Sequence, residues 1–281
     1  MTYNPLIPTD AVMRRAGDQT LVVLDCRFDM MRPTWGEQEY RIAHIPGARY
    51  AHLERDLSGP ITRKSGRHPL PDKEVWLARV RAWGIASDST VVVYDDNKCN
   101  FAARAWWMLR WIGHENVRVL DGGWAAWGYG RGPVTIHVPK PTPTDLKANP
   151  PLVGLVTVDQ VAEKMEQGYM LLDARSPERF SGLVETFDTV AGHVPGARNF
   201  PFGGNMAQDG RLRAPQDLHQ RYSEMLEETP PDQVMHMCGS GVTACVNLLA
   251  MEVAGLTGSS LYAGSWSEWI RDPERPVETG Q

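Results

Sequence analysis

The sequence has 281 residues, of which 42% are hydrophobic and 22% are charged, and its formal net charge at pH 7 is −5. This size and composition predict two globular domains, and the acidic balance without a basic run argues against nucleic acid as the main partner. We find no apolar run of about 18 residues and no signal-peptide pattern, so we expect no membrane span. Four cysteines in a chain of this length do not form a disulfide framework, which predicts a reducing cytoplasm.

Short β-rich runs alternate with segments of helical periodicity in the first half of the chain. Runs at residues 20–24, 90–94 and 117–120 predict buried strands, and residues 72–83 and 102–112 predict helices. Buried strands separated by helices indicate a mostly parallel sheet covered on both faces. Ligands of such sheets bind beyond the carboxyl ends of the strands. The first of these helices is predicted from four apolar positions at helical spacing: Val75, Leu77, Val80 and Trp83.

Three motifs occur twice in the same order at nearly constant separation. An Asp-x-Arg sequence occurs at residues 23–27 and 171–175, and a His-x-Pro-Gly-Ala sequence at 43–49 and 192–198. A Gly-x-Trp sequence occurs at 122–127 and 264–269. Such a repeat predicts two copies of one domain. A proline-rich stretch at residues 139–151 predicts a stiff linker, which separates a first domain at 1–138 from a second at 152–281.

The most informative stretch follows the apolar run at residues 234–237, which ends at Cys238. A glycine-rich loop comes next, and residues 246–253 predict an apolar helix. This arrangement places a sulfur nucleophile at the carboxyl end of a strand. The backbone N–H groups of the loop and the positive end of the helix would stabilise a thiolate there.

Three kinds of chemistry compete for this loop. The glycine spacing of residues 239–244 fits a dinucleotide-binding fingerprint, but that motif needs an acidic residue at the end of the next strand, and residues 260–263 contain none. A cysteine-dependent phosphatase needs an arginine six positions after the cysteine, where this chain has Ala244. Sulfur transfer through a persulfide remains, because it needs one cysteine in a small cradle that stabilises an anion.

Further signatures cover nearly the whole chain. Residues 40–48 read Tyr-x-x-x-His-Ile-Pro-Gly-Ala, and residues 262–269 read Tyr-Ala-Gly-Ser-Trp-Ser-Glu-Trp. With residues 94–96 and 105–110, these motifs make the chain resemble the tandem-domain rhodaneses, a family that includes thiosulfate and 3-mercaptopyruvate sulfurtransferases. The resemblance implies an α/β fold of two tandem rhodanese-like domains, each a mostly parallel sheet flanked by helices. It also implies an enzyme that needs neither a cofactor nor a metal.

The resemblance makes the second domain catalytic, with Cys238 as the persulfide carrier and Ser240 as a second catalytic residue. In the first copy the corresponding loop begins at Asp95, and Cys99 is displaced within it. A carboxylate cannot carry sulfur, so we expect the first domain to be non-catalytic. We interpret Cys245 as a small buried apolar residue rather than as a redox partner of Cys238.

The charge of the loop distinguishes the two donors of the family. Residues 238–244 carry no basic side chain, which is typical of the 3-mercaptopyruvate type rather than the thiosulfate type. The resemblance implies that Arg179 holds the donor carboxylate, although Asp188 stands where a second arginine is usual. It also suggests a hydroxyl–histidine–aspartate relay through Ser240 and His44, without a clear aspartate. The residues expected to bind substrate are Arg179, Gly239, Gly241, Val242, Thr243 and His44.

We therefore expect a cytoplasmic sulfurtransferase that moves sulfur from 3-mercaptopyruvate through Cys238 to a thiol or to cyanide. Two alternatives remain open, a thiosulfate sulfurtransferase and a persulfide carrier for a biosynthetic partner. The expected partners are a small sulfur donor and a thiol acceptor, for which the family offers thioredoxin-like dithiol proteins as candidates. Nucleic acids and membranes are not expected partners.

Overall fold

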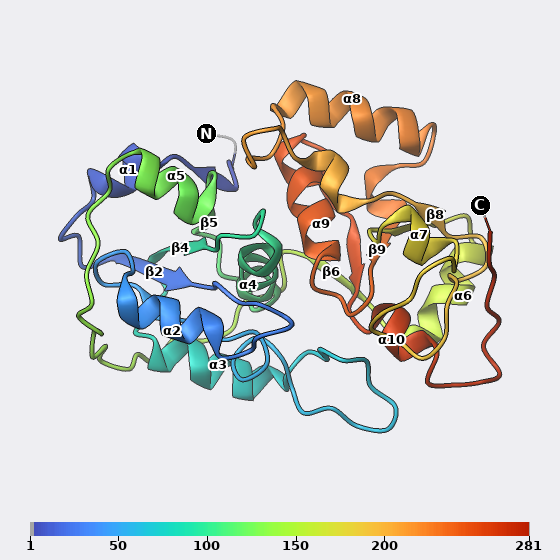
Figure 1. The fold of residues 1–281 in the computed structure, drawn as a ribbon, viewed down its shortest axis with the longest axis horizontal. Coiled ribbons are helices and arrows are strands. Elements are labelled where there is room, and N and C mark those ends of the chain that lie inside the picture. Colours follow the sequence, from blue (N-terminus) through green and yellow to red (C-terminus); the bar gives the residue numbers. More distant parts are fainter. Residues whose placement is uncertain (1–2, 281) are drawn as a thin grey trace. The chain divides into compact units, whose positions relative to one another are not determined.

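The computed structural model describes residues 3–280, which divide into two compact units, each built on one five-stranded sheet (Figure 1). The first unit comprises residues 3–59, 71–152 and 208–212. The second unit comprises residues 60–70, 153–207 and 213–280. Each unit is therefore built mainly from one half of the chain and includes a short segment from the other half. The sequence-based domain boundaries do not include this exchange of segments.

Strands and helices alternate in both units. The strands of the first unit are β1 (Leu6–Ile7), β2 (Leu21–Asp25), β3 (Arg49–Tyr50), β4 (Thr90–Tyr94) and β5 (Val117–Leu120). Its helices are α1 (Thr9–Met13), α2 (Trp35–Ile42), α3 (Lys73–Ala82), α4 (Asn100–Trp111) and α5 (Gly123–Tyr129).

The second unit repeats this pattern. Its strands are β6 (Gly154–Val156), β7 (Met170–Asp173), β8 (Arg198–Asn199), β9 (Val234–Met237) and β10 (Ser260–Tyr262). Its α-helices are α6 (Val158–Glu166), α7 (Pro177–Phe180), α8 (Pro215–Leu226), α9 (Ala244–Val253) and α10 (Ser265–Trp269). Two short 3₁₀ helices are η1 (Phe202–Asn205) and η2 (Pro231–Gln233).

The two sheets have the same topology. The strand order is β1-β5-β4-β2-β3 in the first and β6-β10-β9-β7-β8 in the second, and every pairing between neighbours is parallel. Parallel strands need helical crossovers, which is why helices lie between them in the sequence. The predicted α/β class with two mostly parallel sheets flanked by helices is confirmed. All four residues of β9 are buried, as expected for a central strand covered on both faces.

The predicted helix at residues 72–83 forms as α3. The Asp72 carboxylate accepts hydrogen bonds from the backbone N–H groups of Glu74 and Val75 and caps the helix. Of the four apolar positions that predicted the helix, Leu77, Val80 and Trp83 are buried, whereas Val75 is 63% exposed. Trp76 is fully buried beside it, and its indole N–H donates to Met108 O at 2.9 Å. The larger aromatic side chain therefore determines which face packs inward.

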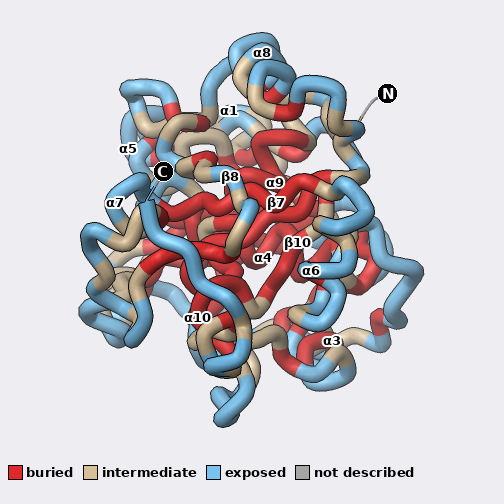
Figure 2. Tube along the Cα trace, turned by 90° about the vertical axis from the view of Figure 1, so that its right-hand side faces the viewer, coloured by how far each residue is buried: buried red, intermediate tan, exposed pale blue. Residues whose placement is uncertain are grey.

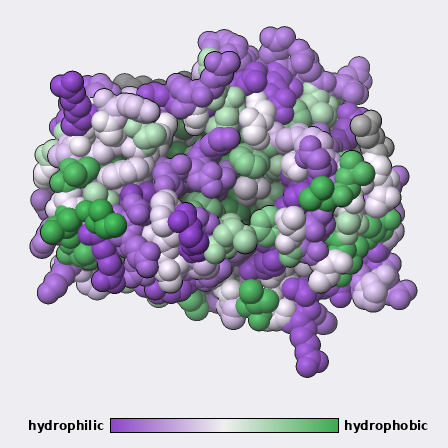
Figure 3. Space-filling view, viewed as in Figure 1, coloured by the Kyte–Doolittle hydropathy of each residue, from purple (hydrophilic) through white to green (hydrophobic). Residues whose placement is uncertain are grey.

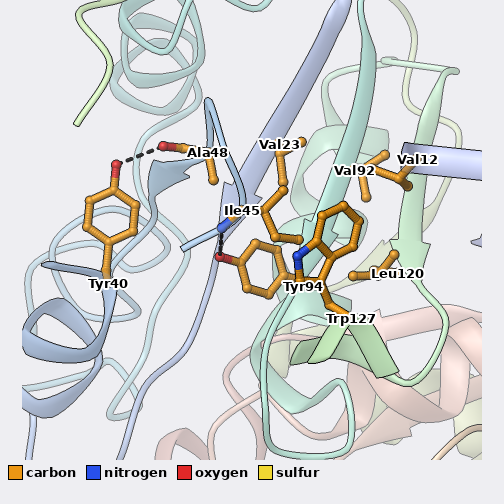
Figure 4. Packing of buried hydrophobic residues seen from close by; sticks show 9 residues of the cluster. All are labelled: Val12, Val23, Tyr40, Ile45, Ala48, Val92, Tyr94, Leu120 and Trp127. Atoms are coloured by element: carbon orange, nitrogen blue, oxygen red, sulfur yellow. Dashed lines mark hydrogen bonds between the residues drawn. The ribbon is translucent and has the colours of Figure 1, made fainter. Parts of the chain in front are cut away.

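A hydrophobic cluster lies against one face of the first sheet (Figure 4). Two tyrosines in it have hydrogen-bonded hydroxyl groups, and that of Tyr94 also donates to the Asp25 carboxylate. Tyr40 Oη donates to Ala48 O at 2.7 Å, and the N–H of Ile45 donates to Tyr94 Oη at 3.4 Å. The cluster consists of Val12, Val23, Tyr40, Ile45, Ala48, Val92, Tyr94, Leu120 and Trp127. A corresponding cluster in the second unit includes Val161, Leu171, Met235, Tyr262 and Trp266.

The three repeated motifs meet at one point in the first unit. Arg27 Nη2 donates to Asp25 Oδ2 at 2.6 Å and to Ala43 O at 2.7 Å. The Arg27 guanidinium also lies 4.3 Å from the ring centroid of Trp124. One buried arginine therefore joins the Asp-x-Arg, His-x-Pro-Gly-Ala and Gly-x-Trp sequences.

The second unit contains the same junction. Arg175 Nη2 donates to Asp173 Oδ2 at 2.7 Å and to Gly192 O at 2.8 Å, and its guanidinium lies 4.8 Å from the ring centroid of Trp266. The side chains of Arg175 and Asp173 are 1% and 0% exposed. The motifs recur in the sequence because each copy of the fold needs this buried ion pair to connect its strand ends.

Most buried residues lie in the strands and in α4 and α9, the helices that follow the central strands β4 and β9. Figure 2 shows α9 and β7 buried, whereas α8 has a long exposed face. Hydrophilic side chains cover most of the face in Figure 3, and the apolar side chains on it lie in separate groups. Within residues 3–280, no helix combines the length and the apolarity that crossing a membrane would require.

Candidate active site

Cys238 directly follows the central strand β9 and lies at its carboxyl end. Its side chain is buried, with 2% of the residue exposed. The backbone N–H of Gly241 donates to Cys238 Sγ at 3.2 Å, so the loop does direct a backbone donor at the sulfur. Helix α9 begins six residues after the cysteine, at Ala244. The predicted sequence of strand, cysteine loop and helix is confirmed.

Gly241 has the residue type that the loop requires. Its φ is +74°, and a Cβ at this position would lie 2.1 Å from Ala263 O. A side chain is excluded both by the left-handed backbone and by the close approach of the segment that follows β10. This tight turn holds the N–H of Gly241 toward the cysteine.

The start of α10 fixes the other side of the loop. Ser265 Oγ accepts a hydrogen bond from the Cys238 N–H at 3.1 Å. The N–H groups of Trp266 and Ser267 donate to Cys238 O at 3.0 Å and to Gly239 O at 2.9 Å. The third repeated motif therefore positions the cysteine in addition to supplying the tryptophan of the buried junction.

The first unit has a carboxylate at the equivalent position. The N–H of Trp124 donates to Asp95 O at 2.8 Å, as that of Trp266 donates to Cys238 O, so Asp95 and Cys238 correspond in the two copies. The Asp95 carboxylate accepts four backbone hydrogen bonds, from the N–H groups of Asn97, Cys99, Phe101 and Ala102 at 2.8–3.1 Å. Burial raises the pKa of this carboxyl despite these bonds. The loop that cradles sulfur in one copy is thus filled by a carboxylate in the other.

A histidine that the sequence analysis missed contacts the cysteine loop. His68 Nδ1 lies 2.8 Å from Ser240 Oγ, and both residues are buried. His68 belongs to residues 60–70, which are part of the second unit. A close contact holds this segment in place, because a Cβ on Gly66 would lie 2.6 Å from Gly264 O. The available signal was an Arg-His pair between a glycine and prolines, in a segment without helical or strand periodicity.

His44, which the sequence analysis assigned to substrate binding, lies in the first unit and is fully buried. Its Nδ1 is 2.6 Å from Tyr40 O and its Nε2 is 3.1 Å from His137 O. Both ring nitrogens thus contact backbone carbonyls of the first unit. Its repeat counterpart, His193, has Nδ1 2.8 Å from Phe180 O, so the repeated histidine has a structural contact in both copies.

Two arginines lie beside the cysteine loop. A Cβ on Gly239 would be 2.8 Å from Arg67 Nη2 and 3.2 Å from Arg179 Nη1. Arg179 lies on α7. Arg67 lies in the 60–70 segment, and its backbone N–H donates to Ser267 Oγ at 3.0 Å. The structure therefore brings the predicted Arg179 to the loop and adds Arg67, which the sequence analysis did not identify.

Each of these arginines is paired with a buried carboxylate. Arg67 forms a bidentate ion pair with Asp188, at 2.9 and 3.0 Å. Arg179 Nη2 donates to Glu185 at 2.7 and 2.9 Å and to Asp188 Oδ2 at 3.2 Å. Burial raises the pKa of Glu185, but the hydrogen bonds and the charge of Arg179 together with the backbone N–H groups of Phe187 and Asp188 lower it further, so the pKa lies below its ordinary value. Asp188 thus ties the two arginines together.

The remaining predicted residues lie in or next to the loop. Val242 is 5% exposed, and Thr243 precedes the first residue of α9. Cys245 is fully buried, and its Sγ donates to Gly241 O at 3.4 Å. The site therefore combines a buried thiol, a backbone N–H donor, a hydroxyl–histidine pair and two arginines, which suits nucleophilic chemistry on an anionic substrate.

The chain is similar to known proteins in both sequence and structure. Residues 9–129 and 157–272 each match the Rhodanese-like domain. The chain is 46% identical over its whole length to the Pseudomonas aeruginosa protein named "Probable 3-mercaptopyruvate sulfurtransferase", all of which is covered. It is 35% identical to "Thiosulfate/3-mercaptopyruvate sulfurtransferase 2" of Arabidopsis thaliana, over 98% of this chain and 87% of that one. The crystal structure of SseA from Escherichia coli, a 3-mercaptopyruvate sulfotransferase, superimposes with a TM-score of 0.80 at 30% identity, covering 94% of this chain and 100% of that one.

Proposed function

Because the chain belongs to the rhodanese-like family and is a sulfurtransferase, we propose that Cys238 is its persulfide carrier and 3-mercaptopyruvate its sulfur donor. The observation that carries this proposal is the position of the thiol, buried at the carboxyl end of β9 with the N–H of Gly241 directed at Sγ. The second unit is then the catalytic domain. The first, with Asp95 in place of the cysteine, has no sulfur nucleophile at the corresponding position.

The reaction follows from these groups in two steps. The Cys238 thiolate attacks the sulfur of 3-mercaptopyruvate, an S–S bond forms, and the C–S bond breaks with its electron pair moving to the enolate of pyruvate. The sulfur keeps its proton, so Cys238 becomes a persulfide, and the enolate takes up a proton. In the second step a thiolate or cyanide attacks the outer sulfur, the S–S bond breaks, and the Cys238 thiolate returns.

The contact between Ser240 and His68 supports a role of this pair in the proton transfer. Ser240 lies two residues after the nucleophile, and its hydroxyl contacts His68 Nδ1 at 2.8 Å. A hydroxyl held by an imidazole can donate to the forming enolate while the imidazole supplies the replacement proton. This pair takes the role that the sequence analysis gave to Ser240 and His44.

The charge around the thiol supports a carboxylate-bearing donor. Residues 238–244 contain no charged side chain, so the positive charge comes from Arg179 and Arg67 beside Gly239. A guanidinium binds a carboxylate in two parallel hydrogen bonds, which orients the donor as well as attracting it. Thiosulfate is the second candidate donor, because it is also an anion and two guanidinium groups lie beside Gly239. Both groups are paired with Asp188 or Glu185, which favours the monoanionic 3-mercaptopyruvate over this dianion.

The test is a steady-state comparison of 3-mercaptopyruvate and thiosulfate with cyanide as the common acceptor. We expect kcat/KM to be higher for 3-mercaptopyruvate. A higher kcat/KM for thiosulfate would contradict the proposed donor. If neither donor is turned over but the purified protein carries a persulfide on Cys238, the chain acts as a persulfide carrier.

For the acceptor we propose a thiol, with thioredoxin-like dithiol proteins as the candidates to assay. We also propose a cytoplasmic location. In the described residues 3–280, Cys26, Cys99, Cys238 and Cys245 form no disulfide bond, which fits a reducing compartment in which thiols persist. Turnover with a reduced dithiol protein at a rate above that with cyanide would support this acceptor class.

Replacing Arg179 by glutamine should weaken donor binding. The variant Arg179→Gln removes the charge but keeps an amide that can donate to Glu185. Loss of one charge-assisted hydrogen bond costs about 1.5–3 kcal/mol, or roughly a 10- to 150-fold lower kcat/KM, expressed mainly as a higher KM. The matched control is Arg198→Gln, which removes an exposed ion pair with Glu227 in the same unit. Equal KM values for the two variants would show that Arg179 does not bind the donor.

A further inference from the structure

The carboxylates next to the cysteine loop are not explained by nucleophilic sulfur chemistry. Asp188 and Glu185 are ion-paired with the arginines that lie beside Gly239, and their side chains are only 3% and 4% exposed. We propose, on the basis of the proposed function, that Asp188 determines which donor charge the site accepts. In this proposal Arg67 and Arg179, clamped by Asp188, admit one donor carboxylate and disfavour a dianion.

The geometry makes Asp188 the central group of the cluster. Its two oxygens face Nε and Nη2 of Arg67, and Oδ2 is also 3.2 Å from Arg179 Nη2. Both guanidinium groups lie near the ring of Phe187, at 5.4 and 5.1 Å from its centroid. One carboxylate thus holds two arginines from distant segments of the chain against the same aromatic ring.

The cluster is electrically balanced. Its cations are Arg67, Arg175 and Arg179, and its anions are Asp173, Glu185 and Asp188. The three positive and three negative charges of the cluster sum to zero. The cluster as a whole therefore does not attract a second negative charge on the donor. A monoanion needs only local hydrogen bonds, whereas each further charge on the donor meets the repulsion of the resident carboxylates.

Donor atoms remain for one carboxylate. Within residues 3–280, the hydrogen bonds of both guanidinium groups use Nε and Nη2, and no hydrogen bond uses Nη1 of Arg67 or Arg179. Arg179 Nη1 is the atom that lies 3.2 Å from a Cβ position on Gly239, the neighbour of the nucleophile. The two Nη1 groups are therefore available to the carboxylate of a donor whose sulfur reaches Cys238, and Arg67 becomes a second determinant of donor binding.

The first experiment measures local charge without a sulfur donor. Cys238 is alkylated with iodoacetate, which carries a carboxylate, and with iodoacetamide, which is neutral, and the adduct is followed by mass spectrometry of the peptide that contains Cys238. In Asp188→Asn the ratio of the iodoacetate rate to the iodoacetamide rate should rise about tenfold, because one nearby negative charge is removed. In Arg67→Gln the same ratio should fall several-fold. Asp188→Glu, which keeps the charge, should restore the wild-type ratio.

The control is Asp232→Asn, which removes an exposed carboxylate from the same unit outside the cluster and should leave the ratio unchanged. An unchanged ratio in Asp188→Asn would overturn the proposal. So would an equal change in both alkylation rates, because it would show that the substitution acts on the thiol or on the fold rather than on charge recognition.

The second experiment measures selectivity in turnover. The ratio of kcat/KM for thiosulfate to kcat/KM for 3-mercaptopyruvate should rise about tenfold in Asp188→Asn, because the dianion gains more than the monoanion from the lost repulsion. A ratio equal to that of the wild type would overturn the proposal. If the wild type turned over neither donor, the proposed function would fail by itself, since the alkylation ratio does not depend on the donor.

Discussion

The variant Cys238→Ser should lose sulfur transfer from both 3-mercaptopyruvate and thiosulfate. The expected loss in kcat is on the order of 10⁴- to 10⁶-fold, as for removal of other covalent nucleophiles. A hydroxyl cannot form a persulfide, so mass spectrometry of Cys238→Ser after incubation with the donor should show no added sulfur atom. The fold should be retained, because the serine oxygen can still accept the hydrogen bond from the Gly241 N–H and occupies less space than sulfur.

The matched control is Cys99→Ser, the same chemical change in the first unit, on a residue whose side chain is partly exposed. It should keep full turnover, because the equivalent position of that copy is occupied by Asp95. Turnover by Cys238→Ser, or a donor-derived sulfur found on Cys99 in the wild type, would contradict the assignment of the nucleophile.

The second large effect is on stability, at the buried junction of the repeated motifs. Replacing Asp173 by alanine removes the close partner of Arg175 and leaves this guanidinium, which is 1% exposed, with only the longer ion pair of 3.6 Å to Glu185 Oε2. This loss should lower the free energy of unfolding by about 3 kcal/mol. Arg175 keeps its hydrogen bond to Gly192 O and its contact with Trp266, but neither group neutralises the charge. Urea denaturation followed by circular dichroism measures the loss.

Two further variants separate the lost charge pair from a general packing defect. The double variant Asp173→Leu, Arg175→Met removes both charges and should be much closer to the wild type, because it leaves no buried charge uncompensated. In the first unit, Asp25→Ala should cause a comparable loss, since Asp25 pairs with Arg27 in the same way. If the double variant were less stable than Asp173→Ala, the charge left on Arg175 would not be the cause.

Much of the fold could be predicted from local sequence patterns. The strand at residues 90–94 and the strand at 117–120 form with the predicted bounds. Runs rich in β-branched residues are typical of strands whose two faces are covered in a parallel sheet. The repeat predicted two copies of one fold, and the structure explains it through the buried ion pairs of Arg27 and Arg175. The helix at 72–83 also forms, with Val75 exposed and its larger neighbour Trp76 buried.

The sequence by itself determined the cysteine loop, because everything that defines it is local: a buried strand, Cys238, the glycine turn and the following helix. The role of Arg179 came from the family resemblance, and the structure places this residue on the short helix α7 after β7. The partners of these residues depend on contacts between distant segments, which no local pattern encodes. His68 meets Ser240 across 172 residues of sequence, and Arg67 meets Asp188 across 121.

Only the tertiary structure decided what Asp188 does. In the sequence it is an acidic residue where a second arginine was expected, which suggests weaker binding of an anionic donor. In the structure it brings Arg67 to the loop and clamps it beside Arg179. The physical reason is that the field at the thiol depends on which charges the fold brings together. Their order along the chain carries no information about this.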